Sequence, residues 1–368
     1  MIYLDCAATS FQKPPQVARA AARALADASS PGRGAYGAAM KASRYMLDAR
    51  EAAAELFNVS EPDNIVLTMN ATHALNIAIN TLARKGCKTV ISGFEHNAVT
   101  RPLHAIGANV TVAGRTLFDE ENVLEEFESA LDGAELAVCT HVSNVFGFVL
   151  PIYQIAEMCA DRGVPLIVDA SQSAGILQLD CRRLGAAFIA MPGHKSLLGI
   201  PGSGLLICGE RATPLLYGGS GGESIRQDMP DYLPDRLEAG TQNAPAAAAL
   251  AEGIRYVLRQ GPERILRHEQ ALCARMTRHL SGRGDVELFT PENGKSTVLS
   301  LRVKDRDCEE LASALAADGI CVRSGLHCAP LAHRSAGTLE TGTLRMSFSP
   351  FNTSAEIDRA AAKLIKII

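Results

Sequence analysis

The chain has 368 residues, of which 47% are hydrophobic, and its formal net charge at pH 7 is −4. This length is typical of about two domains with a sizeable core. Because Lys and Arg form no dense block, the sequence argues against a surface for nucleic acid or an anionic membrane. No apolar run is long enough to cross a bilayer and no secretory signal follows Met1, so we expect a cytoplasmic protein.

From about residue 64, short apolar runs alternate with helical patterns. We expect strands at 64–68, 89–93, 109–114, 136–141, 165–171, 187–193 and 204–209, and helices at 71–83, 101–107 and 151–163. Strands this apolar, separated by helices, indicate a parallel sheet covered on both faces. The sequence therefore predicts a large α/β domain over residues 58–243.

The pattern changes after residue 243. We expect a long helical stretch at about 244–282, an apolar run at 296–303, a helix at about 308–318, short runs at 321–324 and 344–350, and a closing helix from Thr353. This order indicates a smaller α/β domain with a mixed or antiparallel sheet. Residues 1–57 are mainly helical and are expected to fold onto it, so that the smaller domain comprises 1–57 and 244–368.

Ten cysteines are spread along the chain without forming a CxxC pair. This spacing argues against a zinc ribbon or a thioredoxin-like redox pair, and no metal site is expected. A disulfide framework is also not expected in a chain of this length without a secretion signal. Most of the cysteines lie in apolar stretches, where a thiol packs as a small hydrophobic side chain.

Polar side chains follow several predicted strands at the end where ligands collect in α/β sheets. Each signal alone is weak, because a lysine is usually a solvated charge and an aspartate at a strand end usually caps a helix. Their order is more informative: a helix start suited to anions, then a ring-shaped side chain, a carboxylate and a lysine. The residues are Asn70–Thr72, His96, Asn144, Asp169–Gln172, His194 and Lys195.

This order suits pyridoxal phosphate. Lys195 would form the Schiff base, with its pKa lowered by burial and by nearby cationic charge. Asp169 would pair with the pyridinium nitrogen and keep it protonated. Ala71 and Thr72, at a helix start, would supply N–H groups and a hydroxyl for the phosphate, and His96 would stack on the ring.

Ten motifs resemble those of the class V aminotransferase-fold pyridoxal phosphate enzymes, most closely the cysteine desulfurases of group II, which include selenocysteine lyases. They are YLDCAATS (3–10), NATHALN (70–76), EHNAV (95–99), HVSNVFG (141–147), VDASQS (168–173), GHK (193–195), GGSGGE (218–223), LEAGTQN (237–243), VRSGLHCAP (322–330) and GTLRMSFSPFNT (342–353). The resemblance implies fold type I of these enzymes, with a mainly parallel seven-stranded sheet in the large domain and a smaller carboxy-terminal α/β domain.

The resemblance also implies roles around the cofactor. Gln172 would reach the ring hydroxyl, whereas Thr72, Ser171 and His194 would hold the phosphate. Thr241 is expected at the phosphate of the other subunit, which implies a homodimer.

A second set of roles concerns the substrate, L-cysteine. Asn144 and Arg345 would orient its carboxylate, Arg345 bidentately, and Arg323 is placed with them. Lys195 would move the α-proton, and the thiolate of Cys328 would take the sulfur as a persulfide and leave L-alanine.

The Cys328 thiolate needs stabilising, because an unperturbed cysteine has a pKa of about 8.5. His327 or Arg323 would supply favourable charge, or His96 would exchange a proton with the substrate thiol. The remaining cysteines singled out, Cys6, Cys139, Cys181 and Cys321, are interpreted as packing residues.

Some positions depart from the family pattern. Ala71 stands where a threonine is common, and Gly32 lies near an expected histidine. The span from Gly222 to Glu238 is short, which places the surface for a sulfur acceptor in doubt. The short segment between Cys328 and Arg345 favours group II.

Four alternative hypotheses remain open. A selenocysteine lyase would release selenium without a cysteine nucleophile, an aminotransferase would stop after one half-reaction, and a cysteine lyase would give pyruvate. A cysteine-rich scaffold would bind no cofactor. The acceptor of the sulfur, whether a protein, a thiol or an intermediate, is not indicated by the sequence.

Overall fold

The computed structural model describes residues 1–32, 34–291 and 296–368. Its helices are α1 (Pro15–Asp27), α2 (Gly37–Phe57), α3 (Ala71–Leu82), α4 (Asn97–Ile106), α5 (Glu120–Ala130), α6 (Ile152–Asp161), α7 (Cys181–Leu184), α8 (Ala244–Gln260), α9 (Pro262–Leu280), α10 (Cys308–Ala317), α11 (Pro330–Ser335) and α12 (Ser354–Ile367). Its strands are β1 (Ile2–Tyr3), β2 (Ile65–Thr68), β3 (Lys88–Ser92), β4 (Asn109–Ala113), β5 (Leu136–Thr140), β6 (Leu166–Asp169), β7 (Phe188–Pro192), β8 (Gly204–Cys208), β9 (Val286–Phe289), β10 (Val298–Val303), β11 (Ile320–Cys321), β12 (Arg323–Gly325) and β13 (Thr343–Ser347).

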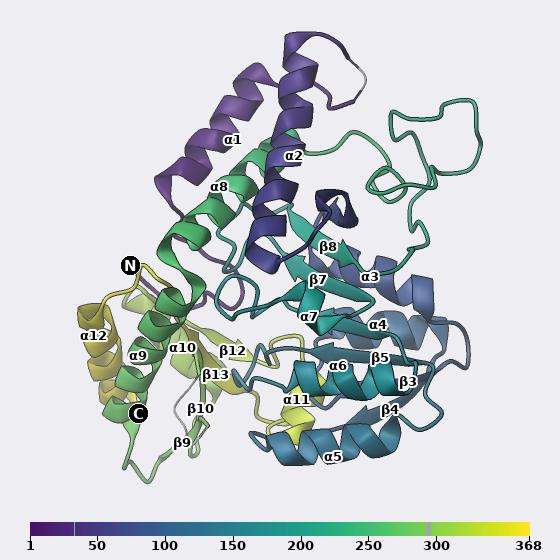
Figure 1. Ribbon diagram of the computed structural model, residues 1–368. Coiled ribbons are helices and arrows are strands. Elements are labelled where there is room, and N and C mark those ends of the chain that lie inside the picture. Colours follow the sequence, from purple (N-terminus) through teal and green to yellow (C-terminus); the bar gives the residue numbers. More distant parts are fainter. Residues whose placement is uncertain (33, 292–295) are drawn as a thin grey trace.

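The larger sheet has seven strands in the order β2-β8-β7-β6-β5-β3-β4. All neighbouring pairs are parallel except those of β8, which runs antiparallel to both β2 and β7. Helices α3 and α4 pack on one face, and α2, α5 and α6 pack on the other (Figure 1). The prediction of a mainly parallel seven-stranded sheet covered on both faces is confirmed. Every residue of β5 to β8 is buried, which explains why these strands are apolar throughout.

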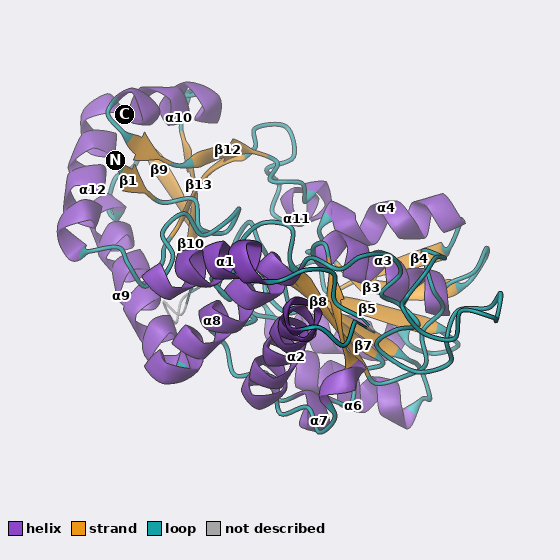
Figure 2. Ribbon diagram, turned by 90° about the horizontal axis from the view of Figure 1, so that it is seen from above, coloured by secondary structure: helices purple, strands orange, loops and turns teal. Residues whose placement is uncertain are grey.

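The smaller sheet has four antiparallel strands in the order β12-β13-β10-β9. Helices α9, α10 and α12 bury their apolar faces against it, in one core with Leu299, Leu301 and Leu344. Strand β1 pairs in parallel with β11, so the start of the chain joins this part of the molecule (Figure 2). The expected mixed or antiparallel sheet is antiparallel.

The first 57 residues contact both parts of the molecule. Helices α1 and α2 pack against α8, and α2 also places Met46 and Phe57 in the core beneath the larger sheet, with Ile65 and Leu67. The division of the chain at residues 58 and 243 stays a prediction.

Local signals set the helix ends. The side chains of Asp119 and Asn243 accept hydrogen bonds from the first turns of α5 and α8, and Thr353 forms a capping box with Glu356 at the start of α12. The predicted long helix over 244–282 is two helices, because Gly261, at φ +79°, ends α8 and begins α9. Among the described residues, no helix combines the length and apolar character needed to span a membrane.

Candidate active site

The carboxyl ends of three adjacent strands bring the predicted site residues together. Asp169 is the last residue of β6, between β5 and β7, and only 2% of it is exposed. Asn144 follows β5 and Lys195 follows β7. Because β5, β6 and β7 are parallel, their polar ends lie at the same edge of the sheet, as the sequence predicted.

Lys195 lies in a short connection between β7 and β8. The N–H of Gly193 donates to the carbonyl oxygen of Ser203 at 2.8 Å, and the N–H of Gly199 donates to the carbonyl oxygen of Gly193 at 2.8 Å. A further turn is closed by the N–H of Leu198 and the carbonyl oxygen of Lys195 at 2.9 Å. Because β8 runs antiparallel to β7, both ends of this connection lie at the same edge of the sheet. These hydrogen bonds fix the backbone position of Lys195.

The surroundings of Lys195 lower its pKa to about 8. Burial is the largest cause, Asp169 opposes it, and the positive charges of Arg345 and Arg323 add to it. At pH 7 about a tenth of such a lysine is the uncharged amine, far more than for an ordinary lysine, and this is the form that reacts with a carbonyl group.

Two histidines flank this edge. His96 precedes α4, and its Nδ1 accepts a hydrogen bond from the N–H of Ala98 at 3.0 Å, so the proton of the neutral ring is on Nε2. The predicted helix at 101–107 therefore starts earlier, at Asn97, because the ring of His96 caps it. Burial lowers the pKa of His194 to about 4, so this ring is neutral at pH 7, and burial also lowers the pKa of His96.

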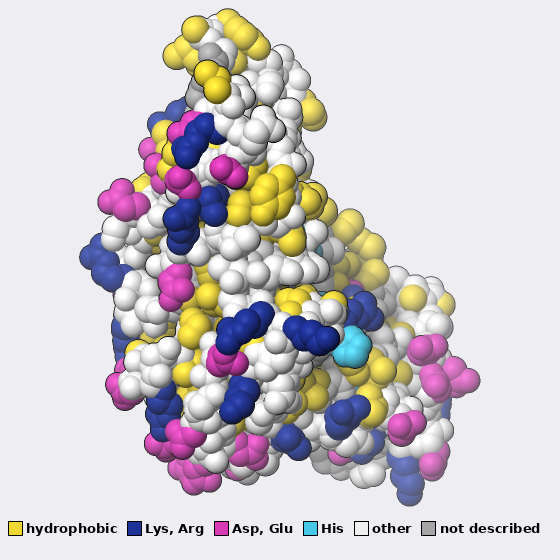
Figure 3. Space-filling model, turned by 90° about the vertical axis from the view of Figure 1, so that its right-hand side faces the viewer, with side chains coloured by type: hydrophobic (Ala, Val, Ile, Leu, Met, Phe, Trp, Pro, Cys, Tyr) yellow, Lys and Arg dark blue, Asp and Glu magenta, His cyan; other side chains and the backbone are white. Residues whose placement is uncertain are grey.

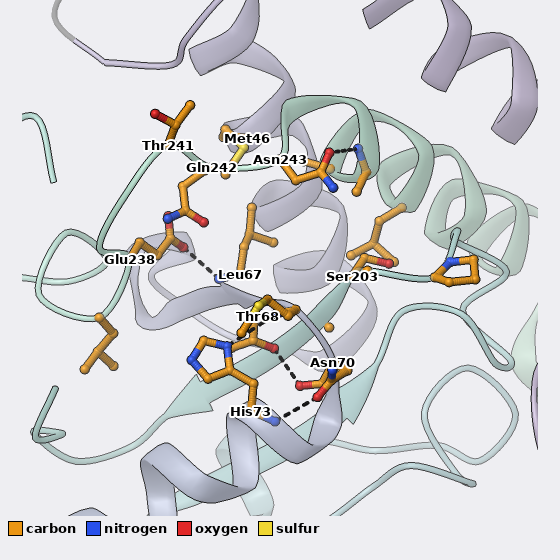
Figure 4. Close-up of a pocket in the computed structure, with 18 of the residues that line it drawn as sticks. Met46, Leu67, Thr68, Asn70, His73, Ser203, Glu238, Thr241, Gln242 and Asn243 are labelled. Atoms are coloured by element: carbon orange, nitrogen blue, oxygen red, sulfur yellow. Dashed lines mark hydrogen bonds between the residues drawn. The ribbon is translucent and has the colours of Figure 1, made fainter. Parts of the chain in front are cut away.

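Two of the residues predicted to hold a phosphate, His194 and Thr241, line a cavity of about 650 Å³. Asn70 and His194 line it, and the Asn70 side chain caps α3 by accepting from the N–H of His73 at 2.9 Å. Figure 4 shows Thr241 on the opposite side of this cavity from Asn70. Ala71 and Thr72 are the first residues of α3, where free N–H groups favour an anion.

Ser171 and Gln172 are positioned by their backbone neighbours. The N–H of Ser171 donates to Oδ1 of Asp169 at 2.9 Å, which orients this carboxylate. The Gln172 side chain donates to the carbonyl oxygen of Ala7 at 3.0 Å. Both residues lie beside Asp169, but their predicted contacts with a cofactor stay predictions.

Arg345 is buried, with 1% of it exposed, and it is already engaged within the protein. One terminal nitrogen donates to Oδ1 of Asp5 at 2.6 Å, and the other donates to the carbonyl oxygen of Asn144 at 2.9 Å. Its Nε is buried without a partner among the described residues. A substrate carboxylate would therefore have to bind at the N–H groups of this guanidinium that are still without an acceptor, or displace Asp5.

Cys328 lies on an exposed loop, and it is the one exposed cysteine of the ten, all of which are free thiols. His327 and Cys328 both have left-handed backbone angles, with φ values of 50° and 56°. Two hydrogen bonds anchor this loop to the segment after β5 and to the start of α4: Asn144 Nδ2 donates to the carbonyl oxygen of His327, and the N–H of Asn97 donates to the carbonyl oxygen of Cys328, both at 2.8 Å.

His327 does not supply charge to Cys328. Its ring is buried with Nε2 3.2 Å from the carbonyl oxygen of Thr343, and burial together with Arg345 lowers its pKa to about 2. The hypothesis of a cationic His327 is therefore wrong, and Arg323 on β12 is the remaining cationic candidate of the two.

Sequence reasoning missed the contribution of the amino-terminal segment. Asp5 pairs with Arg345, Ala7 accepts from Gln172, and the hydroxyl of Thr9 lies 3.0 Å from Nδ1 of His194. The signal was present, because these residues belong to the motif YLDCAATS. Glu95 was missed as well, although it adjoins His96: it is fully buried and its pKa is raised to about 8, chiefly by burial.

The sequence profile of the family "Aminotransferase class-V" matches residues 2–360. The chain therefore belongs to the class-V aminotransferases, as its motifs predicted.

Individual relatives narrow this class. A probable cysteine desulfurase of Methanothermobacter thermautotrophicus is 34% identical, over 100% of this chain and 94% of the relative. The apo structure of a cysteine desulfurase from Thermococcus onnurineus NA1 superposes with a TM-score of 0.91 at 30% identity, over 100% of this chain and 94% of that one. A cysteine desulfurase from Escherichia coli, at 23% identity and a TM-score of 0.87 over 100% and 95%, shares the fold. Within its class, the chain belongs to the cysteine desulfurase family.

Proposed function

We propose that the protein is a pyridoxal-phosphate-dependent cysteine desulfurase that moves the sulfur of L-cysteine onto Cys328. The observation that carries the proposal is the placement of Lys195, with a pKa of about 8, beside the buried Asp169, together with an exposed thiol on the loop bonded to Asn144. A reactive amine, a carboxylate and an accessible sulfur nucleophile are the three groups that this reaction requires.

The residues present fit pyridoxal phosphate. Asp169 is a buried carboxylate held by the N–H of Ser171, which suits a protonated ring nitrogen. Lys195 is the candidate for covalent attachment, and the start of α3 at Ala71 and Thr72, with His194, is the candidate phosphate site. When bound, the cofactor would withdraw electrons from the α-carbon of the substrate.

The protein's own groups would perform the remaining tasks. Arg345 would orient the substrate carboxylate through its guanidinium group, whose Nε has no partner among the described residues. Lys195 would move the α-proton. The Cys328 thiolate would attack the substrate sulfur, so that an S–S bond forms, the C–S bond breaks with its electron pair on carbon, and a proton completes L-alanine.

We also propose that the protein acts as a homodimer. Large hydrophobic side chains are exposed at the start of α2, beside α3 and in the connection between β8 and α8: Tyr36, Met40, Met69, Leu216, Tyr217 and Ile225. Figure 3 shows such side chains at the top and along the middle of one face. A second subunit on this surface would cover them and bring its own Thr241 toward the phosphate site. Sedimentation of the purified protein, with and without the charge substitution Ile225→Asp, measures this directly.

The decisive experiment on function is a product assay. The purified protein with pyridoxal phosphate, L-cysteine and a reductant should release sulfide and L-alanine in equal amounts. Cys328→Ser should abolish both products while leaving the absorbance of the bound cofactor unchanged, and Cys321→Ser, from the same segment, is the matched control. Full activity of Cys328→Ser would contradict the proposal.

The same assay separates the nearest alternative. A Cys328→Ser variant that is active on selenocysteine and inactive on L-cysteine would identify a selenocysteine lyase, because selenium leaves without a cysteine nucleophile. Pyruvate in place of alanine would identify a lyase.

A further inference from the structure

Next to the Cys328 loop, an open groove of about 350 Å³ lies at the edge of the larger sheet. Its floor is apolar, and α4, β4 and α11 form its walls. The lining residues are Ile91, Thr100, His104, Ala108, Val110, Val112, Pro330, Leu331 and Arg334. Pro330 and Leu331, the first residues of α11, follow Cys328 by two and three positions, so the groove begins close to the nucleophile in the chain.

The walls of the groove carry no negative charge. Residues 96–118, which contain α4 and β4, include no Asp or Glu, and neither do residues 319–339, which contain the Cys328 loop and α11. These segments nevertheless contribute Arg101, Arg115, Arg323 and Arg334. In a chain whose net charge is −4, this is a local excess of positive charge around an exposed thiol.

The arginines at the rim are available to a partner. Arg101 and Arg334 are exposed, and in the part of the chain that the structure describes no hydrogen bond or ion pair engages their guanidinium groups. Unpaired arginine around an apolar groove is typical of protein interfaces, where Arg is enriched.

The edge of the sheet adds a second feature. β4 pairs only with β3 among the described strands, and the side chains of Val110 and Val112 project into the groove. The side chain of Arg115 donates to the carbonyl oxygen of Val112 at 3.0 Å and so covers one end of this edge. The groove thus offers apolar contact beside an open backbone edge, within a positive rim.

We propose that this groove docks an acidic segment of the protein that accepts the sulfur from Cys328. The proposal rests on the function proposed above, since the acceptor meets a persulfide only if Cys328 carries one. In the transfer, a thiolate of the acceptor attacks the outer sulfur of the Cys328 persulfide, a new S–S bond forms, and Cys328 leaves as a thiolate. No oxidant or reductant is needed.

The test uses two synthetic peptides that differ in charge, EELCEE and KKLCKK, and the holoenzyme loaded with sulfur from L-cysteine. Mass spectrometry measures the rate at which each peptide gains sulfur. We expect EELCEE to react at least about tenfold faster at low salt, and the advantage to shrink as salt screens the charges. Equal rates for the two peptides would overturn the proposal.

Substitutions in the groove test whether it causes the preference for the acidic peptide. Arg334→Glu should slow EELCEE about tenfold and accelerate KKLCKK, and Val110→Glu should slow EELCEE. Arg278→Glu, an exposed arginine of α9 far along the chain from the groove, is the matched control and should change neither rate. Arg101 is left intact because its charge acts on His96. An advantage for EELCEE that survives both groove substitutions would overturn the proposal.

Two further measurements separate this proposal from the proposed function. If the enzyme forms no persulfide, the proposed function fails, and anisotropy of fluorescein-labelled peptides still decides whether the groove prefers acidic segments. If the persulfide forms normally but passes to both peptides equally, only the docking proposal fails. A single-stranded oligonucleotide is tested in the same way. If it binds more tightly than EELCEE, and Arg334→Glu removes this binding, the groove is a nucleic-acid site and the docking proposal is wrong.

Discussion

The two halves of the candidate site are built in opposite ways. Asp169 and Lys195 are held by the ends of buried strands, where backbone hydrogen bonds on both sides leave little freedom. Cys328 sits on an exposed loop, in a left-handed conformation, with two anchoring hydrogen bonds to the segment after β5 and to the start of α4. A binding group gains from fixed geometry, whereas a sulfur carrier has to reach both a buried substrate and an acceptor outside.

The largest effect should come from the strand-end half. Lys195→Ala is expected to lower the rate of alanine formation by about 10³-fold or more, because a positioned proton-transfer group alone contributes about 10²–10⁴-fold. The rate is measured with saturating pyridoxal phosphate and L-cysteine. Lys13, whose pKa burial also lowers to about 8, is the matched control. A loss in Lys13→Ala as large as that in Lys195→Ala would remove the distinction between these two lysines.

The larger sheet should also depend on a buried ion pair beside its edge strand β2. Arg50 donates to both carboxylate oxygens of Glu238, at 2.7 and 2.6 Å, and Glu238 accepts from the N–H of Leu67 on β2. Arg50→Ala leaves a buried carboxylate without its partner and should lower the free energy of unfolding by about 3–5 kcal/mol. Urea denaturation measures the loss. The double substitution Arg50→Met with Glu238→Leu should recover much of it, and a double variant as unstable as the single one would contradict this account.

A rise in pH from acidic to neutral should lower the stability of this region through Glu95. Burial raises its pKa to about 8 from an ordinary value of 4.5, so the folded protein keeps a proton that the unfolded chain releases. Stability contributed by this group is therefore greatest below pH 4.5 and declines as the pH rises toward 8. Relative to the neutral Glu95→Gln variant, wild type should lose about 3 kcal/mol between pH 4.5 and pH 7. Parallel stability curves for the two proteins would show that Glu95 does not titrate in this way.

Acid should weaken the loop half instead. Burial lowers the pKa of His327 to about 2 from 6.5, so the unfolded chain takes up a proton that the folded loop refuses. Its contribution is constant above pH 6.5 and is lost as the pH falls, by about 2 kcal/mol at pH 5. His327→Asn should show a smaller loss of stability at pH 5 than wild type. Amide hydrogen exchange near Cys328, compared at pH 7 and pH 5, tests whether the loop opens first.

The strand-end half could be predicted from the sequence because its signals are local. Asn144, Asp169 and Lys195 each follow an apolar run, and parallel strands place such ends together. The loop half could be predicted only as a motif. Nothing local to VRSGLHCAP indicates that the His327 ring is buried and neutral, since its environment comes from Thr343 and Arg345, on a neighbouring strand.

Contacts between distant residues were beyond sequence reasoning. The pairing of Asp5 with Arg345 joins positions 340 residues apart, and no periodicity reports it. The break of the predicted helix at Gly261 has a local cause, a glycine with positive φ followed by proline. The sequence pattern nevertheless predicted one helix, because the alanine-rich run before Gly261 and the amphipathic pattern after it are both typical of a helix.

The contact between Asp5 and Arg345 also sets an order of events during synthesis. Asp5 and Ala7 leave the ribosome 340 residues before their partners Arg345 and Ser347. At roughly 5–20 residues per second, the amino-terminal segment waits on the order of 20–70 s for these partners. The site can therefore be completed only after Arg345 and Ser347 have been synthesised, long after the segment that binds them.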